Sequence, residues 1–416
     1  MPKRIVCSEH ETILVGEVPE ATLTEYEVAQ LLRAQGTAQA LGWIDRVRVR
    51  TAEQVGVIAA RGIRMEILPK VESFASKGAR EILVRMLASA WDVTIHDGEF
   101  AQMASQEWDL LEIVIHLFAL RLNAEVRKGL GRSYQQHRDD LPRLRGKLDS
   151  IRQYSRNAAY PQRIACVFDQ LTANTPVNRL LLCAVETLRR RTQVIATGHL
   201  LRQISIHFED VELLPSEVVL REQIFLGPSE RRWRPVMSLA RLLLQGTYQS
   251  THLGVQDGIA LLFDMNQLFE AHVANLIRKI AHRLGYVMTE QGPSGRLVAD
   301  SESNVFVLTR PDIHLDLEGR VLILDTKWKR LEAKPGLGIS AADVYQMHAY
   351  QHVYGASETV LIFPKDGWLH AEASHVQWTF VQSSKSLKIF GIDLADTSNF
   401  TEAISALLET FASCPA

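Results

Sequence analysis

The chain has 416 residues, of which 46% are hydrophobic and 23% are charged, and its formal net charge is −2 at pH 7. This length predicts two or three domains with sizeable cores, and the composition is ordinary for a soluble globular protein. No run of about 18 apolar residues occurs, which argues against a membrane span. Because the net charge is close to zero, any DNA binding has to come from local basic patches.

Cysteine usage and the N-terminal residues indicate the compartment. The four cysteines, Cys7, Cys166, Cys183 and Cys414, are scattered and form no C-x-x-C pair. This spacing argues against a zinc site, an iron–sulfur cluster and a disulfide framework. Met1-Pro2-Lys3-Arg4 is not followed by the apolar stretch of a signal peptide. We therefore expect a cytoplasmic protein.

The first part of the chain, residues 1–75, is expected to be rich in strands. A helix is predicted at residues 24–33. Residues 46–50 alternate strictly between arginine and valine, which predicts a half-buried strand with a cationic outer face. Two apolar runs on either side of Arg61-Gly62 predict a hairpin.

The middle of the chain, residues 76–255, is expected to be mostly helical with short strands. The helical pattern extends from about residue 79 to residue 200, and Pro176 fits the first turn of one of its helices. The named elements are helices at 108–122 and 177–190, strands at 204–208 and 219–223, and a helix at 235–245.

The last part, residues 256–416, is predicted to be a mixed sheet flanked by helices. A helix at 265–284 has Asp264 as its N-cap and Gly285 as its terminator, and a second helix at 341–354 starts after Ser340. Further elements are strands at 358–363, 376–381 and 387–392 and a helix at 402–411.

A hairpin between these two helices carries two carboxylates. Residues 313–317 alternate in polarity, residues 321–324 form an apolar run, and Glu318-Gly319 makes a plausible two-residue turn. Pairing about this turn places Asp312 directly opposite Asp325. Opposed residues have Cβ atoms about 4.5–5.5 Å apart, and like charges at that distance repel. Two carboxylates held in this way need a cation between them.

Lys327 shares the face of Asp325 because strand side chains alternate with period two. Two acids that chelate a hard divalent ion such as Mg²⁺, with an ammonium group beside them, are the parts of a metal-dependent phosphodiesterase. Arg310-Pro311-Asp312 and Asp325-Thr326-Lys327 together match the PD-(D/E)xK nuclease pattern. A bare match is more often a solvated turn, but the register, the apolar strand and the flanking helices favour the nuclease.

Three polar residues on the flanking helices are further candidates. Glu270 borders the apolar face of its helix, either as an ordinary boundary carboxylate or as a third metal ligand or water-orienting group. Gln346 and Tyr350 are four residues apart and therefore share a helix face. They are either part of the core or a pair that orients the catalytic lysine or a phosphate.

Basic residues gather around the hairpin. Arg310, Lys329 and Arg330 lie within a few residues of the two carboxylates. Their alternative role is a solvated surface, but next to a candidate nuclease site contact with DNA phosphates is the better interpretation.

The motifs together resemble one protein family, McrC, the nuclease subunits of McrBC-type GTP-dependent, modification-directed restriction systems. No catalytic position departs from the family's pattern, although the first fifty residues match weakly. The matching segments are Val55-Gly56-Val57, Ile67-Leu68-Pro69-Lys70, Leu144-Arg145-Gly146-Lys147-Leu148-Asp149, Thr175-Pro176-Val177-Asn178-Arg179-Leu180, Phe263-Asp264-Met265-Asn266-Gln267-Leu268-Phe269-Glu270 and Asp325-Thr326-Lys327-Trp328-Lys329.

The resemblance implies an α+β multidomain protein whose C-terminal domain has the restriction-endonuclease-like fold and cuts double-stranded DNA. It also implies a partner, an AAA+ GTPase of the McrB type that forms hexameric rings and whose hydrolysis the N-terminal part stimulates. The chain itself contains no G-x-x-x-x-G-K-[ST] motif, which fits a separate motor chain. Residues 46–50 and the Arg61-Gly62 turn are candidates for the ring contact, with a plain exposed hairpin as the alternative.

Two other functions stay open from the sequence. One is a catalytically silent adaptor that only activates the ring, and the intact set Asp312, Asp325 and Lys327 argues against it. The other is a stand-alone repair nuclease, which the long N-terminal region without a DNA-binding motif makes less attractive.

Overall fold

The computed structural model describes residues 3–16, 21–36, 38–70, 76–95, 103, 108–160, 162–252, 258–299, 305–317, 319–332, 334, 336–365, 375–381 and 385–413. The chain divides into two compact units, one made of Met1–Gln106 with Leu262–Ala416 and the other of Glu107–Leu261. The predicted boundaries at residues 75 and 255 lie in stretches outside the described residues, so that division stays a prediction.

The N-terminal part of the first unit is built from two small sheets and one helix, α1 (Glu25–Ala34). Four strands form a sheet in the order β1-β6-β5-β10, and three form a sheet in the order β2-β4-β3. Their bounds are β1 (Lys3–Ser8), β2 (Thr12–Leu14), β3 (Leu41–Asp45), β4 (Arg48–Thr51), β5 (Gln54–Ala60), β6 (Ile63–Leu68) and β10 (Ile259–Asp264).

Two of the predictions for this region are confirmed, and one is corrected. The helix and the hairpin around Arg61-Gly62 are present, and Ala60 pairs with Ile63 across that turn. Residues 46–50 do not form one strand, because Arg46 and Val47 make the turn between β3 and β4. The Asp45 side chain closes this turn by accepting a hydrogen bond from the backbone N of Val47.

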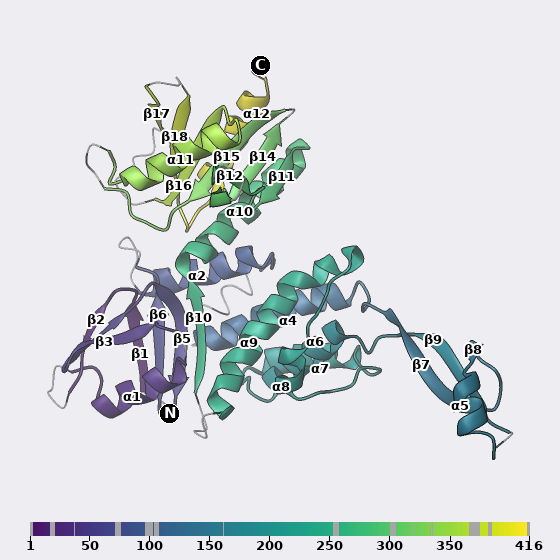
Figure 1. Cartoon of the computed structure of the whole chain (residues 1–416). Helices are drawn as coiled ribbons and strands as arrows, with labels where there is room; N and C mark the ends of the chain where they lie inside the picture. The colour runs from purple at the N-terminus through teal and green to yellow at the C-terminus, as the bar shows by residue number, and fades with distance from the viewer. Residues whose placement is uncertain are drawn as a thin grey trace. The chain divides into compact units, whose positions relative to one another are not determined.

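The C-terminal part of the first unit is a six-stranded sheet in the order β11-β14-β15-β16-β18-β17. β15, β16 and β18 run parallel to one another and the other pairs are antiparallel, so the predicted mixed sheet is confirmed. The bounds are β11 (Val287–Glu290), β14 (Ile313–Leu317), β15 (Arg320–Thr326), β16 (Glu358–Pro364), β17 (His375–Thr379), β18 (Ser386–Ile392), α10 (Met265–Leu284), α11 (Ala341–Val353) and α12 (Ser398–Ser413). Figure 1 shows α11 and α12 beside this sheet.

The predicted hairpin is β14 and β15, in the predicted register. Leu317 pairs with Arg320 at the turn, and Ile313 pairs with Leu324 at the other end. Gly319 has φ +89°, a conformation that a side chain disfavours. The same register continued by one position sets Asp312 against Asp325. Glu318 lies outside the described residues.

The two helices that flank the hairpin begin as predicted. The Asp264 side chain accepts hydrogen bonds from the first backbone N–H groups of α10, and Gly285 ends that helix with φ +77°. Ser340 and Asp343 form a capping box at the start of α11. These caps fix where the polar residues of each helix lie relative to the hairpin.

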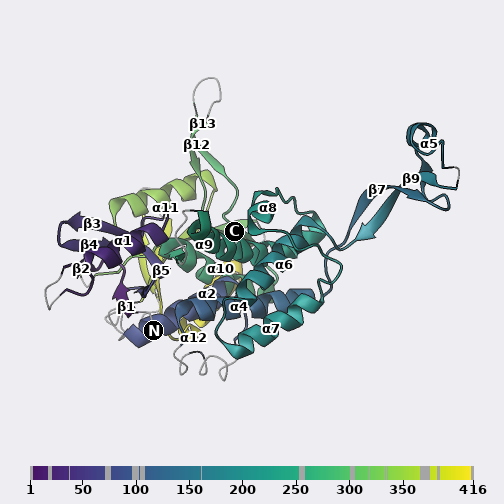
Figure 2. The same cartoon turned by 90° about the horizontal axis from the view of Figure 1, so that it is seen from below.

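One further element of the first unit was not predicted, and one predicted helix belongs to this unit. A small hairpin of β12 (Gly295–Ala299) and β13 (Val305–Thr309) projects from the C-terminal part (Figure 2). Helix α2 (Ser76–Ala90), placed in the middle region by the sequence pattern, packs against α10. The Asn275 side chain on α10 donates a hydrogen bond to the backbone O of Ser89 at 2.7 Å.

The second unit is a helical body with a projecting arm, visible in Figures 1 and 2. The body contains α4 (Leu110–Val126), α6 (Pro176–Arg189), α7 (Ile195–Ile206), α8 (Ser216–Arg221), η1 (Pro228–Trp233) and α9 (Arg234–His252). The arm, residues 133–172, contains β7 (Ser133–Leu141), β8 (Lys147–Leu148), α5 (Ser150–Ser155) and β9 (Ile164–Thr172). β9 pairs antiparallel with β7 and with β8.

The helices predicted at 108–122, 177–190 and 235–245 are confirmed as α4, α6 and α9. The strands predicted at 204–208 and 219–223 are wrong, since the first overlaps the end of α7 and the second the end of α8. The helical pattern predicted up to residue 200 is also wrong within the arm. In the described part of the chain no helix is long and apolar enough to cross a membrane.

Candidate active site

Asp325 on strand β15 and Lys327 just after the strand lie close together at the end of the hairpin. Asp325 belongs to the interior strand β15 and is only 1% exposed. Beyond the strand, the backbone N of Lys327 donates to the O of Ile362 at 2.9 Å, which prolongs the pairing with β16. The Lys327 side chain turns back, and its Nζ lies 2.7 Å from Oδ2 of Asp325.

Asp312 is held beside the end of the same strand. Its Oδ2 accepts hydrogen bonds from the backbone N of Thr326 at 2.7 Å and from Oγ1 of Thr326 at 2.8 Å. Both bonds orient the Asp312 carboxylate toward the residue that lies between Asp325 and Lys327. The predicted neighbourhood of the two acids and the lysine is therefore present in the structure.

Helix α11 contributes Gln346 and Tyr350, which form one network with these residues. Oε1 of Gln346 accepts from Nζ of Lys327 at 2.9 Å, and its Nε2 donates to the hydroxyl of Tyr350 at 2.7 Å. A longer contact of 3.4 Å joins the same Nε2 to Oδ1 of Asp325. The Tyr350 hydroxyl in turn donates to the backbone O of Arg310 at 3.0 Å. Gln346 therefore orients the lysine, as one of the two interpretations of the sequence predicted.

The charges of the site shift one another's pKa values. Burial, followed by the negative charge of Asp312, raises the pKa of Asp325 to about 7. Burial alone lowers the pKa of Lys327, but the carboxylates of Asp325 and Asp312 outweigh it and raise that pKa. Burial and then Asp312 also raise the pKa of Glu270 on α10. Three carboxyl groups therefore share one crowded electrostatic environment.

Glu270 joins the site through a residue that the sequence did not single out. Nε2 of Gln291 donates to Oε1 of Glu270 at 2.6 Å, while the backbone O of Gln291 accepts from Nε of Arg310 at 2.6 Å. The backbone N of Gln291 donates to the O of Asp312 at 2.7 Å. Gln291 adopts φ +49°, and no motif marks a lone glutamine in such a turn. It ties α10 to the start of the hairpin.

The three basic residues predicted to contact DNA all have partners within the chain. Arg310 binds the backbone of Gln291, Nζ of Lys329 lies 3.0 Å from Asp343 Oδ2, and Arg330 donates to the backbone O of Lys70 at 3.0 Å. All three remain at least partly exposed. Their contact with DNA phosphates stays a prediction.

The carboxylates provide some of the ligands that a divalent cation requires. Within the described ranges no group of three or more His, Cys, Asp or Glu side chains stands ready to hold a metal ion. Oδ2 of Asp325, however, is buried, and its polar contact among the described residues is the ammonium of Lys327 at 2.7 Å. A buried acid whose pKa is raised by burial and by a second acid beside it fits a Mg²⁺ ligand, since hard cations prefer carboxylate oxygens.

We predict that Asp325 makes the metal-free protein less stable as pH rises from about 4 to about 7. In this window folded Asp325 keeps a proton that the unfolded chain has released, because its folded pKa is raised to about 7. The free energy of unfolding therefore falls with pH. Urea titrations at pH 5 and pH 7.5 in a chelator should show this fall, and Asp325→Asn should reduce it. An equal fall in both proteins would contradict the prediction.

Comparison with known protein families identifies the family of the chain. Residues 49–364 match the model of the McrBC 5-methylcytosine restriction system component, which is more than half of the chain. The chain belongs to this family. The matched range contains all six candidate catalytic residues and the three candidate DNA contacts, and the resemblance to McrC that the motifs predicted is confirmed. No curated protein sequence matches the chain.

One solved assembly that contains McrC includes a chain of similar fold. A chain from a tetradecameric assembly of Thermococcus gammatolerans McrB AAA+ hexamers with bound McrC aligns over 97% of this chain and 100% of its own length, with a TM-score of 0.60 and 18% identity. A cryo-EM structure of the Thermococcus gammatolerans McrBC complex aligns over 67% of this chain and 88% of its own, with a TM-score of 0.48 and 20% identity. The first similarity indicates that this member of the family keeps the McrC fold.

Proposed function

We propose that this McrC family member is the metal-dependent endonuclease subunit of a restriction system and cuts double-stranded DNA together with an AAA+ GTPase of the McrB type. One observation carries the proposal. The β14–β15 register sets Asp312 against Asp325, and Lys327 pairs with Asp325 at 2.7 Å. This is the constellation that phosphodiester hydrolysis assisted by a metal ion requires.

Asp312 and Asp325, with Glu270, are the residues that would hold Mg²⁺. The bound ion supplies Lewis acidity and lowers the pKa of the attacking water. Lys327 places a cation where negative charge builds up on the phosphate oxygens during the reaction. Gln346 and Tyr350 fix the position of that cation. Oε1 of Gln346 accepts a hydrogen bond from Lys327, and its Nε2 donates one to the Tyr350 hydroxyl.

The proposal is tested with the chain and the McrB-type GTPase of the same organism, purified together. We expect Mg²⁺- and GTP-dependent breaks in DNA that contains 5-methylcytosine. A complex that hydrolyses GTP and leaves the DNA intact would instead support the catalytically silent adaptor. Breaks made by the chain without its partner, at the same rate, would support the stand-alone nuclease.

The arm of the second unit is the surface that fits a partner ring best. Exposed large apolar side chains are concentrated on it, the most exposed being Ile151 (85%) and Tyr154 (81%) on α5. A concentration of exposed apolar groups, unlike a single exposed group, marks an interaction site. By contrast, Arg48 of the predicted ring contact pairs with Asp45, and Nε of Arg50 donates to the backbone O of His10. We therefore place the proposed ring contact on the arm instead of on residues 46–50, and the Arg61-Gly62 turn stays the second candidate.

We expect Tyr154→Asp to reduce stimulation of the partner's GTP hydrolysis at least 10-fold, because a charge replaces a largely exposed aromatic anchor of the interface. The chain itself should keep its thermal stability, since the side chain makes little contact in the free protein. Tyr26→Asp is the matched control, because Tyr26 on α1 is also largely exposed, at 66%. Normal stimulation by Tyr154→Asp, or an equal loss in both variants, would move the contact away from the arm.

A further inference from the structure

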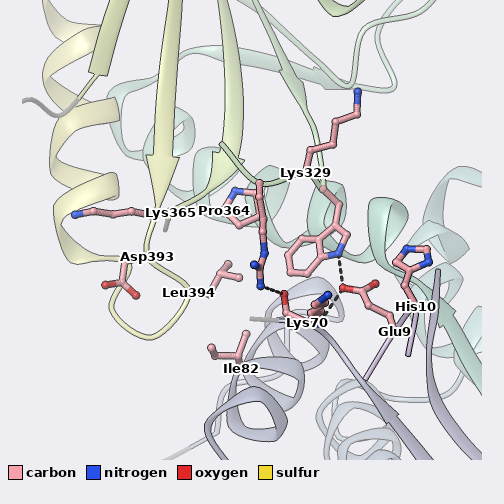
Figure 3. Close-up of a pocket in the computed structure, with 11 residues that line it drawn as sticks. Glu9, His10, Lys70, Ile82, Lys329, Pro364, Lys365, Asp393 and Leu394 are labelled. Carbon is pink, nitrogen blue, oxygen red and sulfur yellow. Dashed lines mark hydrogen bonds between the residues drawn. The ribbon is translucent and has the colours of Figure 1, made fainter. Parts of the chain in front are cut away.

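The residues that follow Lys327 connect the candidate active site to the N-terminal sheet. Nε1 of Trp328 donates to Oε1 of Glu9 at 3.1 Å, and Arg330 donates to the backbone O of Lys70 at 3.0 Å. The backbone N of Lys70 donates to the same Oε1 of Glu9 at 2.9 Å. Figure 3 draws these three bonds as dashed lines. We call Glu9, Lys70, Trp328 and Arg330 the clamp.

Glu9 is held firmly in place on the N-terminal side of the clamp. It follows β1 directly, its backbone N donates to the O of Leu68 at 2.9 Å, and its side chain is 4% exposed. Burying a carboxylate is costly unless it is hydrogen-bonded. Its Oε2 accepts no hydrogen bond in the described part of the chain, so Oε1 supplies both bonds of the side chain.

Trp328 is placed to affect two candidate site residues at once. Its ring packs against the ring of Phe269 on α10, with centroids 5.5 Å apart and planes at 59°. These two aromatic residues are the immediate chain neighbours of Lys327 and Glu270. The indole is therefore one peptide bond away from the lysine and one ring contact away from the residue next to the glutamate.

Trp328 is only half-buried, so packing encloses part of its ring. A cavity of about 360 Å³ adjoins the clamp, lined by Glu9, Trp328 and Arg330 together with Ile82 and Leu394, among others. Close-packed neighbours normally keep a core side chain in a single rotamer. Here the pocket leaves space beside the indole, so the hydrogen bond to Glu9 adds to packing in holding the ring in place.

We propose that Glu9 is a positioning residue of the nuclease site, acting through Trp328 on Lys327 and on Glu270. The inference rests on the proposed function, because it assigns to the N-terminal sheet the geometry of the site that cuts DNA. A displacement of about 1 Å in a reacting group costs about 10²-fold in rate. Loss of the hydrogen bond between Trp328 and Glu9 therefore lowers the turnover number and leaves DNA binding unchanged.

The test uses the full chain with its GTPase partner and measures kcat and KM for DNA cleavage. Glu9→Leu removes the acceptor, Trp328→Phe removes the donor and keeps a ring against Phe269, and Glu9→Gln keeps an acceptor oxygen. We expect Glu9→Leu and Trp328→Phe to lose about 10- to 100-fold in kcat with KM within twofold. Glu9→Gln should stay within about threefold of the wild type, and the double variant Glu9→Leu with Trp328→Phe should be no worse than the worse single variant.

Glu11→Leu is the matched control, because the Glu11 carboxylate is exposed and accepts a hydrogen bond from the backbone N of Ser8. If Glu9→Leu does not fold, Trp328→Phe and Glu9→Gln decide the question. Wild-type kcat in Trp328→Phe overturns the inference, as does a loss confined to KM or to thermal stability. Multiplicative losses in the double variant also overturn it. A wild-type complex that does not cut DNA refutes the proposed function itself.

Discussion

Asp325→Asn should lower DNA cleavage by the complex by about 10²-fold or more, the loss expected when a group that stabilises transition-state charge is removed. Asparagine has nearly the shape of aspartate, so the contact with Gln346 can survive. It cannot supply the negative charge that pairs with Lys327 at 2.7 Å and that a metal ion requires. The measurement is the rate of double-strand breakage in Mg²⁺, with GTP hydrolysis followed in the same samples.

Stimulation of GTP hydrolysis should remain at the wild-type level in Asp325→Asn, because the proposed ring contact lies on the arm of the other unit. Asp316→Asn is the matched control. Asp316 is an exposed residue of β14 whose side chain accepts a hydrogen bond from the backbone N of Gly319 at the turn. Cleavage at the wild-type rate by Asp325→Asn would remove Asp325 from the site.

The second large effect is expected at Lys327. Lys327→Arg keeps the charge, but the planar guanidinium is wider than the ammonium and its donors are fixed. Nζ lies between Asp325 at 2.7 Å and Gln346 at 2.9 Å, which leaves little room for such a group. We expect Lys327→Arg to lose most of the cleavage rate and Lys327→Ala to lose about 10²-fold or more.

DNA affinity at fixed salt separates catalysis from binding in these variants. One phosphate contact among several contributes little to affinity, so both Lys327 variants should bind DNA almost normally. Lys388→Arg is the matched control, because Lys388 is a strand lysine of the same sheet that pairs with Glu358 at 2.9 Å. If affinity falls in step with the rate, Lys327 holds the DNA and does not act in the reaction.

The parts of the site that the sequence predicted are those set by local rules. The register of β14 and β15 follows from the turn at Gly319 and the alternation on both sides of it, which brings Asp312 to Asp325. The caps of α10 and α11 are sequence signals as well, and they fix the rotation of each helix. The residue pattern alone was therefore enough to group Gln346 and Tyr350 with Lys327.

Contacts between segments far apart in the chain were not predictable in this way. Gln291 joins Glu270 to Arg310 from a turn without a motif, and Glu9 reaches Trp328 across 319 positions of the sequence. Tertiary packing determines both sets of contacts, and the periodicity of the sequence gives no signal of them.

The arm was missed for a different reason. Most residues of β7 are exposed or half-buried on both faces, so the strand lacks the alternation that marks a half-buried strand. The helical pattern on either side of the arm therefore extended across it. The same exposure that removed the alternating pattern from the sequence of the arm also suits the arm to the proposed ring contact.

The dependence of cleavage on Mg²⁺ tests the central claim most directly. The measurement is the rate of breakage of 5-methylcytosine DNA by the complex across a Mg²⁺ titration, for the wild-type chain and for Asp312→Asn, with GTP hydrolysis recorded alongside. We predict that the wild-type rate rises with Mg²⁺ to a plateau while Asp312→Asn stays near the background and hydrolyses GTP normally. Cleavage by Asp312→Asn with the wild-type Mg²⁺ dependence would contradict a metal site built on Asp312 and Asp325.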